Sequence, residues 1–165
     1  MQQSIIIGVM GGADPGPEVE AAALDMGRLI ANQGWILLNG GRNVGVMAAS
    51  ARGAAEKGGI TVGILPGETS TGACKHIAIS ILTGMGMARN CINVLSSTVV
   101  VAFPGGAGTI SEIALALKYD RPVILVGFDP GGLFLSYKAA GRLFTVKSPE
   151  QAIVRIQTIL SSGDM

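Results

Sequence analysis

A buried strand that ends in a glycine turn and leads into a helix is the feature that most limits how this chain can fold. Residues 98–103 are β-branched and apolar without polar alternation, which is typical of a strand buried on both faces. The glycines of residues 104–108 allow a sharp turn, and the free N–H groups of the following helix point into the space beside it. The segment therefore predicts an anion-binding turn. Glu112 is expected in the first helical turn, where it either caps the helix or faces the ligand.

Two further glycine turns lie earlier in the chain. Residues 11–16 follow an apolar strand over residues 4–10, and residues 39–45 follow a strand over residues 35–38. In a parallel sheet the carboxyl ends of the strands share one edge, and ligands bind beyond that edge. The three turns are therefore expected to meet and to form one anion site.

Strand and helix patterns alternate along the chain. This alternation predicts a single domain over residues 1–165 with an α/β, Rossmann-like doubly wound fold, in which helices cover both faces of a mostly parallel sheet. Residues 128–141 have no clear pattern and are not assigned to an element. The remaining predicted strands cover residues 60–65, 76–82, 122–127 and 143–146, and the predicted helices cover 18–33, a segment ending near 57, 85–96, 109–119 and a last helix that starts near 148.

Composition limits the class of partner. The chain has a net charge of +1, only 4% aromatic residues and no basic run, which argues against nucleic acid or an anionic membrane surface. No apolar run reaches the roughly 18 residues of a membrane span, and no basic region precedes the first apolar run. We expect a cytoplasmic protein that binds a small phosphorylated molecule. The mean hydropathy of +0.50 is high, which favours a homo-oligomer that buries apolar surface.

Several common site motifs are missing from the sequence. It contains no GxGxxG turn followed by an acidic residue, no GxxxxGK[ST] loop and no GxSxG elbow, and its single histidine is His76. Neither a redox nucleotide nor a protein-bound metal is expected.

Arg89 lies at the start of the helix before strand 98–103, where it can reach the glycine turn. An arginine suits bidentate contacts with phosphate.

Three segments together resemble the lysine-decarboxylase-like, or "lonely guy", family. They are Asn-Gly-Gly and Gly-Val-Met within residues 39–47, Met-Ala-Arg-Asn at residues 87–90, and Pro-Gly-Gly-Ala-Gly-Thr with Glu112 in residues 104–112. The resemblance covers about residues 4–128. It implies a Rossmann-like fold, assembly into dimers or tetramers and, in the best-known members, hydrolysis of the N-glycosidic bond of nucleoside 5′-monophosphates.

The same resemblance assigns roles to individual residues. Arg89 matches the family's catalytic arginine and Glu112 its catalytic glutamate, and the turn that contains Gly105 matches its phosphate-binding turn. In two places the chain departs from the hydrolases, which usually have Lys where this chain has Asn90 and Glu where it has Ser111. One cation and one carboxylate of the hydrolase pattern are therefore missing.

With these differences the sequence looks closer to the molybdenum cofactor carrier branch of the superfamily. That resemblance implies binding, protection and carriage of the molybdenum cofactor (phosphorylated molybdopterin), with no protein ligand to the metal. Two alternatives stay open: a phosphoribohydrolase that uses Arg89 and Glu112 for catalysis, and a nucleotide sensor without catalysis. The residues expected to bind the ligand are Gly11, Gly12, Asn39, Gly40, Gly41, Arg42, Thr69, Ser70, Arg89, Pro104, Gly105, Gly106, Ala107, Gly108, Thr109 and Glu112.

Overall fold

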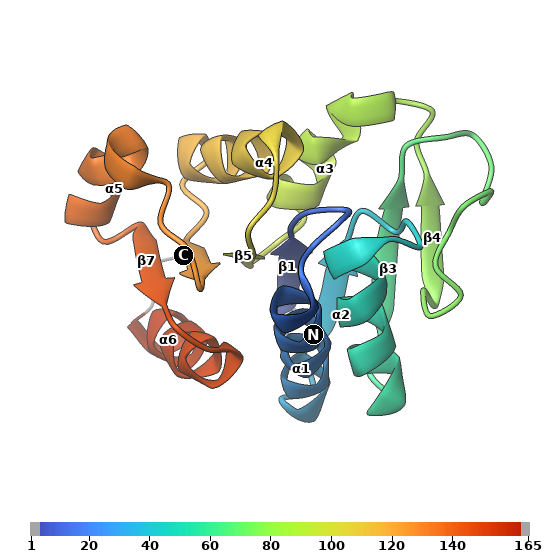
Figure 1. The fold of residues 1–165 in the computed structure, drawn as a ribbon, viewed down its shortest axis with the longest axis horizontal. Coiled ribbons are helices and arrows are strands. Elements are labelled where there is room, and N and C mark those ends of the chain that lie inside the picture. The colour runs from blue at the N-terminus through green and yellow to red at the C-terminus, as the bar shows by residue number, and fades with distance from the viewer. Residues whose placement is uncertain (1–3, 163–165) are drawn as a thin grey trace.

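The computed structural model describes residues 4–162, and within this range seven parallel strands form one sheet (Figure 1). The strand order is β4-β3-β2-β1-β5-β6-β7. Every neighbouring pair is parallel, so the sheet is fully parallel where a mostly parallel one was predicted. The strands are β1 (Ile6–Met10), β2 (Ile36–Asn39), β3 (Thr61–Leu65), β4 (Ile79–Leu82), β5 (Val99–Ala102), β6 (Val123–Val126) and β7 (Leu143–Val146).

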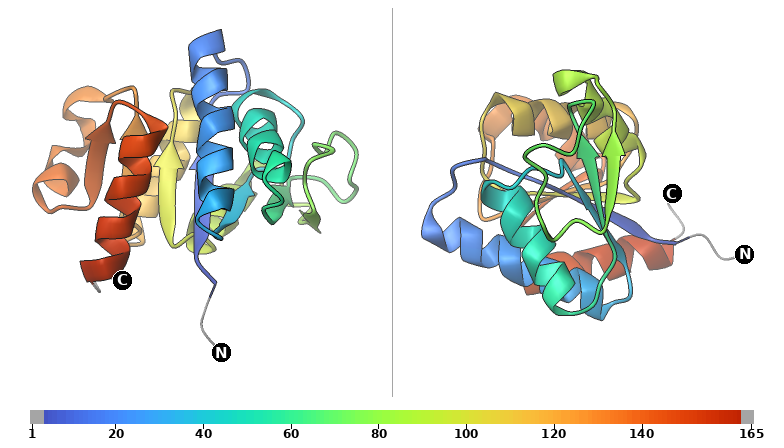
Figure 2. Two further views of the ribbon diagram at one scale, coloured as in Figure 1. Left: turned by 90° about the horizontal axis from the view of Figure 1, so that it is seen from below. Right: turned by 90° about the vertical axis from the view of Figure 1, so that its right-hand side faces the viewer.

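Helices cover both faces of the sheet, which confirms the predicted Rossmann-like α/β architecture. One face is covered by α1, α2 and α6, and the other by α3, α4 and α5 (Figures 1 and 2). None of the helices in the described range is long and apolar enough to cross a membrane. Their bounds are α1 (Pro17–Asn32), α2 (Gly45–Glu56), α3 (Asn90–Leu95), α4 (Ala107–Lys118), α5 (Leu135–Ala139) and α6 (Pro149–Ser162), and two 3-10 helices are η1 (Gly86–Arg89) and η2 (Gly131–Phe134).

Burial on both faces explains why the sequence of the central strand β5 lacks polar alternation. Val99 and Val101 pack into the core under α1, α2 and α6, whereas Val100 and Ala102 pack into the core under α3 and α4. All four are fully buried, because successive side chains of a strand point to opposite faces and both faces are covered here.

The strand order places a natural binding crevice beside β1. From β1 the chain winds outward through β2 and β3 to β4, and then it returns to β5 on the other side of β1 and winds outward to β7. The direction of winding therefore reverses between β1 and β5. In open parallel sheets the crevice at such a reversal, beyond the carboxyl ends of the strands, is where ligands bind.

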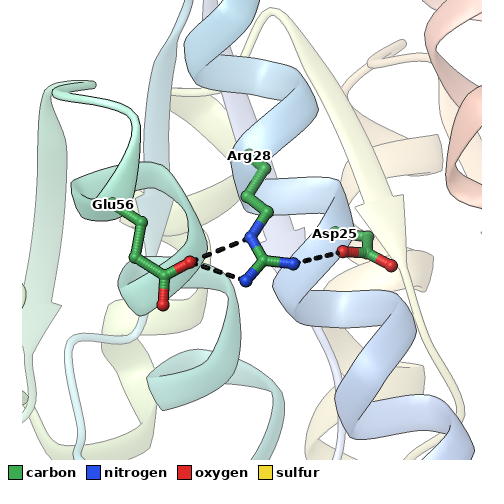
Figure 3. A network of polar contacts seen from close by, with 3 residues as sticks. All are labelled: Asp25, Arg28 and Glu56. Carbon is green, nitrogen blue, oxygen red and sulfur yellow. Dashed lines mark hydrogen bonds and ion pairs between the residues drawn. The ribbon is translucent and has the colours of Figure 1, made fainter.

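Helices α1 and α2 pack closely on the face opposite α3 and α4. A Cβ on Gly27 of α1 would overlap the carbonyl oxygen of Ser50 in α2, so glycine allows the two helices to approach. At their exposed ends Arg28 donates hydrogen bonds to Glu56 and to Asp25 (Figure 3). Because these three side chains are exposed, the ion pairs contribute little to stability.

The structure differs from the sequence prediction in three segments. The strand predicted over residues 76–82 is shorter, because Cys74 and Ile77 are held in a turn and only β4 pairs with β3. The helix predicted over residues 85–96 is split into η1 and α3. Residues 128–141, which could not be assigned, contain η2 and α5.

Candidate functional site

A cavity of about 210 Å³ opens at the crevice between the carboxyl ends of β1 and β5. It lies where the turn after β1 meets the turn after β5, and the turn after β2 lines it through Gly40 and Arg42. The prediction that the three turns converge on one edge of the sheet is confirmed. The residues lining the cavity are Met10, Gly11, Gly12, Ala13, Gly40, Arg42, Met47, Met87, Arg89, Asn90, Gly106, Gly108, Thr109 and Glu112.

Backbone hydrogen bonds hold the turns together. The N–H of Gly12 donates to the carbonyl oxygen of Pro104 at 3.0 Å, and the N–H of Val46 donates to the carbonyl oxygen of Gly12 at 3.1 Å. A Cβ on Gly105 would overlap Thr109 Oγ1 and would lie 2.8 Å from Gly12 N, so only glycine fits where the first and third turns touch. At this point the wall of the cavity therefore consists of closely packed backbone.

Arg89 is a buried cation with free hydrogen-bonding capacity. It is only 5% exposed, and its Nε and Nη1 have no hydrogen-bond partner among the described residues. Its guanidinium lies against the backbone of Gly40, where a Cβ would overlap both Nη atoms. Buried cations are normally paired, and an unsatisfied one is costly. Because Arg89 lines the cavity, an oxyanion there would be attracted to its charge.

Glu112 faces the same cavity from α4, but it does not cap that helix. Since α4 begins at Ala107, Glu112 lies in the second turn, which corrects the expectation of a first-turn position. Its Oε1 accepts a hydrogen bond from Asn93 Nδ2 at 2.8 Å. No ion pair links it to Arg89 in the part of the chain that the structure describes.

Burial displaces the pKa values of both charged groups. Burial raises the pKa of the Glu112 carboxyl, against the opposing effects of the Asn93 hydrogen bond and the Arg89 charge. Burial also lowers the pKa of the Arg89 guanidinium; the Glu112 charge raises it and the Arg42 charge lowers it further. Displaced values of this kind gather at functional sites, because desolvated charges are tolerated where a ligand needs them.

The two positions that differ from the hydrolase pattern contact each other. Asn90 Nδ2 donates to Ser111 Oγ at 3.0 Å, and Ser111 Oγ donates to the carbonyl oxygen of Gly108 at 2.7 Å. A neutral hydrogen bond therefore joins α3 to α4 beside Arg89 and Glu112. It adds no charge to the cavity.

The structure brings nine of the sixteen predicted ligand-binding residues to the cavity: Gly11, Gly12, Gly40, Arg42, Arg89, Gly106, Gly108, Thr109 and Glu112. Pro104 and Gly105 belong to the same turn and Ala107 begins α4, but these three residues do not line the cavity. Asn39 is fully buried, donates to Met47 O at 2.9 Å and accepts from Gly41 N at 2.8 Å. It shapes the second turn and does not line the cavity.

Thr69 and Ser70 lie on an exposed loop outside the cavity wall. Thr69 Oγ1 donates to Thr71 Oγ1 at 3.0 Å. The loop is tied to the second glycine turn, because Asn43 N donates to Gly72 O at 3.0 Å and Cys74 N donates to Gly41 O at 2.8 Å. This places the hydroxyls near the Arg42 side of the cavity without making them part of it.

Sequence reasoning missed Asn93 and the methionines at the cavity. Asn93 lies four residues after Arg89, a spacing that places both on the same side of a helical segment, and this is the signal that could have found it. Met10, Met47 and Met87 line the cavity, and Met87 is 64% exposed. A methionine in an apolar run gives no indication in sequence of whether it faces the core or a ligand.

A larger cavity of about 490 Å³ lies elsewhere, between β7 and α6, and its lining includes Glu150 and Arg155. It is open and remote from the glycine turns, and Arg155 there stacks over the ring of Phe144 at 4.8 Å. The smaller cavity is nevertheless the candidate site, because it is lined by Arg89, a buried cation with unpartnered nitrogen atoms. No group of three or more metal-binding side chains occurs in residues 4–162.

The fold and the cavity define a Rossmann-like protein with a cavity at the switch point of its sheet, lined by glycines and by the buried Arg89. The chain belongs to the SLOG cluster4 family, whose model matches residues 4–153. This confirms the resemblance found in the sequence motifs.

Two solved structures are very similar to this chain. The molybdenum cofactor binding protein from the phototrophic bacterium Rippkaea orientalis is 44% identical, with a TM-score of 0.91, over 97% of this chain and 99% of that one. The molybdenum cofactor carrier protein of Chlamydomonas reinhardtii is 41% identical, with a TM-score of 0.88, over 96% and 99% of the two chains. Both relatives therefore match over nearly their entire length.

A hydrolase is a more distant relative. The cytokinin riboside 5′-monophosphate phosphoribohydrolase of Mycobacterium tuberculosis is 33% identical over 130 residues, which are 74% of this chain and 68% of that protein. The chain is thus similar both to proteins named for binding or carrying the molybdenum cofactor and to an enzyme.

Proposed function

We propose that this protein binds the molybdenum cofactor and carries it, with the phosphate end of the cofactor held in the cavity between β1 and β5. The observation that carries this proposal is Arg89, a buried guanidinium with unpartnered Nε and Nη1 beside a turn of free backbone N–H groups. The similarity to two proteins named for binding or carrying this cofactor supports the identity of the cargo.

The residues present fit a phosphate group. The turn at Gly106 leads into α4, a helix of 12 residues whose first N–H groups and positive dipole end face the turn. Arg89 adds a planar cation that can contact two oxygens at once, and Arg42 adds a second positive charge at the cavity.

The size of the cavity indicates which part of the cargo it holds. Its volume of about 210 Å³ is below the roughly 300 Å³ at which cavities bury most of a ligand. The phosphate would therefore be enclosed while the pterin and metal end lies across the rim, where Met87 and the loop with Thr69 and Ser70 are exposed. Carriage requires no protein ligand to the metal.

A phosphoribohydrolase is the second candidate, because the Mycobacterium tuberculosis enzyme is a relative and Arg89 and Glu112 share the cavity. In that case the carboxylate would stabilise positive charge at the anomeric carbon or activate water. The neutral Asn90–Ser111 contact speaks against it, since the hydrolases that the sequence resembles carry a charge at each of these positions. We therefore regard a non-catalytic carrier as the better proposal. A non-catalytic nucleotide sensor has no specific contact in its favour.

The carrier and hydrolase proposals are tested with two assays on one preparation of the protein. Isolated cofactor is mixed with the protein, and the fraction still able to activate a cofactor-free molybdoenzyme is followed over time. We expect the wild type to slow the loss of cofactor and Arg89→Ala to slow it much less. Release of adenine from AMP that disappears in Glu112→Gln would favour the hydrolase.

The predicted homo-oligomer stays a prediction. Apolar side chains are exposed along residues 79–87, where Ile79 is 49%, Ile81 43% and Leu82 46% exposed on the edge strand β4. We expect a dimer or tetramer, because parallel strands are normally covered on both faces. Light scattering behind size-exclusion chromatography measures the mass, and a monomer at every concentration would contradict the prediction.

A further inference from the structure

Glu112 and Asn93 form a buried pair whose polar atoms are only partly used. Asn93 is 0% exposed; its Nδ2 donates to Glu112 Oε1, whereas its Oδ1 has no hydrogen-bond partner among the described residues. The other carboxylate oxygen, Oε2, makes no hydrogen bond within residues 4–162, and Glu112 lines the cavity. Buried polar atoms without partners cost free energy and call for a functional explanation.

The charged groups that line the cavity with Glu112 are both cations. Arg89 reaches the cavity from the junction of η1 and α3, and Arg42 reaches it from the loop between β2 and α2. Asn93 of α3 is neutral, and strands β1 and β5 carry no titratable side chain. Asp14, on the loop after β1, does not line the cavity.

An oxyanion bound to Arg89 would share this small space with the Glu112 carboxylate. Two negative charges in a poorly solvated cavity repel, and the ordinary response of a carboxyl group is to take up a proton. The protonated carboxyl can keep Oε1 as the acceptor for Asn93 Nδ2, while the O–H on Oε2 donates to the oxyanion. Repulsion is thereby replaced by a hydrogen bond.

We propose that an oxyanion binds at Arg89 together with one proton, which moves from solvent to Oε2 of Glu112 and is shared with the bound anion. In this arrangement Asn93 is a positioning residue, because it fixes Oε1 and leaves Oε2 to face the ligand. The inference rests on the proposed function, in which the oxyanion is the phosphate end of the cargo. It adds a dependence of binding on pH, with uptake favoured at low pH and release at high pH.

The direction of the pKa displacement at Glu112 agrees with this arrangement. Burial already raises the pKa of the carboxyl, so that a proton is taken up more readily than by an exposed glutamate. A bound anion would raise the pKa further.

The test uses sulfate as the probe, since sulfate does not itself titrate between pH 5.5 and 8.5. Calorimetry should show wild-type affinity falling with rising pH, by at most about tenfold per pH unit for one linked proton. Glu112→Gln should bind with nearly constant affinity, because its amide can donate at every pH. Titrations in buffers of different ionisation enthalpy should count up to one proton per sulfate in the wild type, depending on pH, and none in the variant. Equal pH slopes in the two proteins would overturn the proposal.

A second pair of variants separates positioning from mere structure. Asn93→Leu removes the hydrogen bond that favours the ionised form of Glu112, so the midpoint of the pH dependence of binding should move to higher pH. A fall in Tm with an unchanged midpoint would show that Asn93 is only structural. Arg42→Gln should weaken sulfate binding at all pH values without changing the slope. Sulfate that fails to bind the wild type at any pH contradicts the proposed function itself, whereas pH-independent binding contradicts only the proton coupling.

Discussion

Asn90 Nδ2 donates a hydrogen bond to Ser111 Oγ at 3.0 Å, and this contact joins α3 to α4 beside the cavity that Asn90 lines. Arg89 precedes Asn90 and Glu112 follows Ser111, so the bond lies next to both charged residues in the chain. A neutral pair thus joins the two helices next to the two charged residues.

The first prediction concerns this pair. Asn90→Ala and Ser111→Ala should each lower the free energy of unfolding by about 1 kcal/mol, the usual contribution of one such hydrogen bond. The double variant should lose less than the sum, because the two side chains share one bond. Urea unfolding of the four proteins measures the coupling. Fully additive losses would show that the bond contributes nothing.

The second prediction is that Arg89 is needed for binding but lowers the stability of the protein. Arg89→Met removes a buried charge that has unpartnered nitrogen atoms, so the protein should become more stable even as it loses affinity for sulfate and for the cofactor. The matched control is Arg28→Met, which removes an exposed arginine on α1 and should leave binding unchanged. Thermal unfolding and calorimetry measure the two effects. A loss of stability in Arg89→Met would mean that the guanidinium is satisfied within the protein.

The third prediction is the pH dependence of stability at Glu112. Burial holds the pKa of this carboxyl above its value in the unfolded chain, so the unfolded state releases its proton first as the pH rises. The wild type therefore loses stability as the pH rises through the interval between the two pKa values, and it keeps its full stability below that interval. Glu112→Gln has no such loss. Its stability relative to wild type should grow with pH, and a difference that is constant from pH 4 to pH 8 would contradict the raised pKa.

The fourth prediction uses a glycine of the cavity wall. Gly40→Ala would place a methyl group on the guanidinium of Arg89 and displace it, so sulfate affinity should fall by about tenfold or more, as expected for losing a charge-assisted contact. Gly16→Ala is the control, because a Cβ there meets nothing within 4 Å. Equal affinity in the two variants would show that the position of Arg89 against Gly40 is unimportant for binding.

Much of the fold could be predicted because its signals are local. The run at β5 is apolar throughout because both faces of that strand are covered, and the glycine turns mark where strands give way to helices. Residues 128–141 could not be placed because η2 and α5 are short, four and five residues, and neither has room for a helical pattern.

The site was only partly predictable for a different reason. Arg89 and Glu112 stand in recognisable motifs. The spacing of Asn93 from Arg89 indicates only that the two lie on one side of a helical segment, and the hydrogen bond of Asn93 to Glu112, 19 residues further on, has no signal in the sequence. The role of Asn39 could not be predicted either, because its side chain forms hydrogen bonds with nearby backbone and shapes the turn without lining the cavity. Such contacts arise from packing, which a sequence pattern does not show.

The central claim, that the cavity carries the molybdenum cofactor by its phosphate, is tested most directly by measuring how long the cofactor stays intact with wild-type protein, Arg89→Ala and the Arg28→Ala control. We predict that wild type and Arg28→Ala protect the cofactor equally and that Arg89→Ala protects it far less. Equal decay with all three proteins, together with adenine release from AMP by the wild type, would contradict the claim.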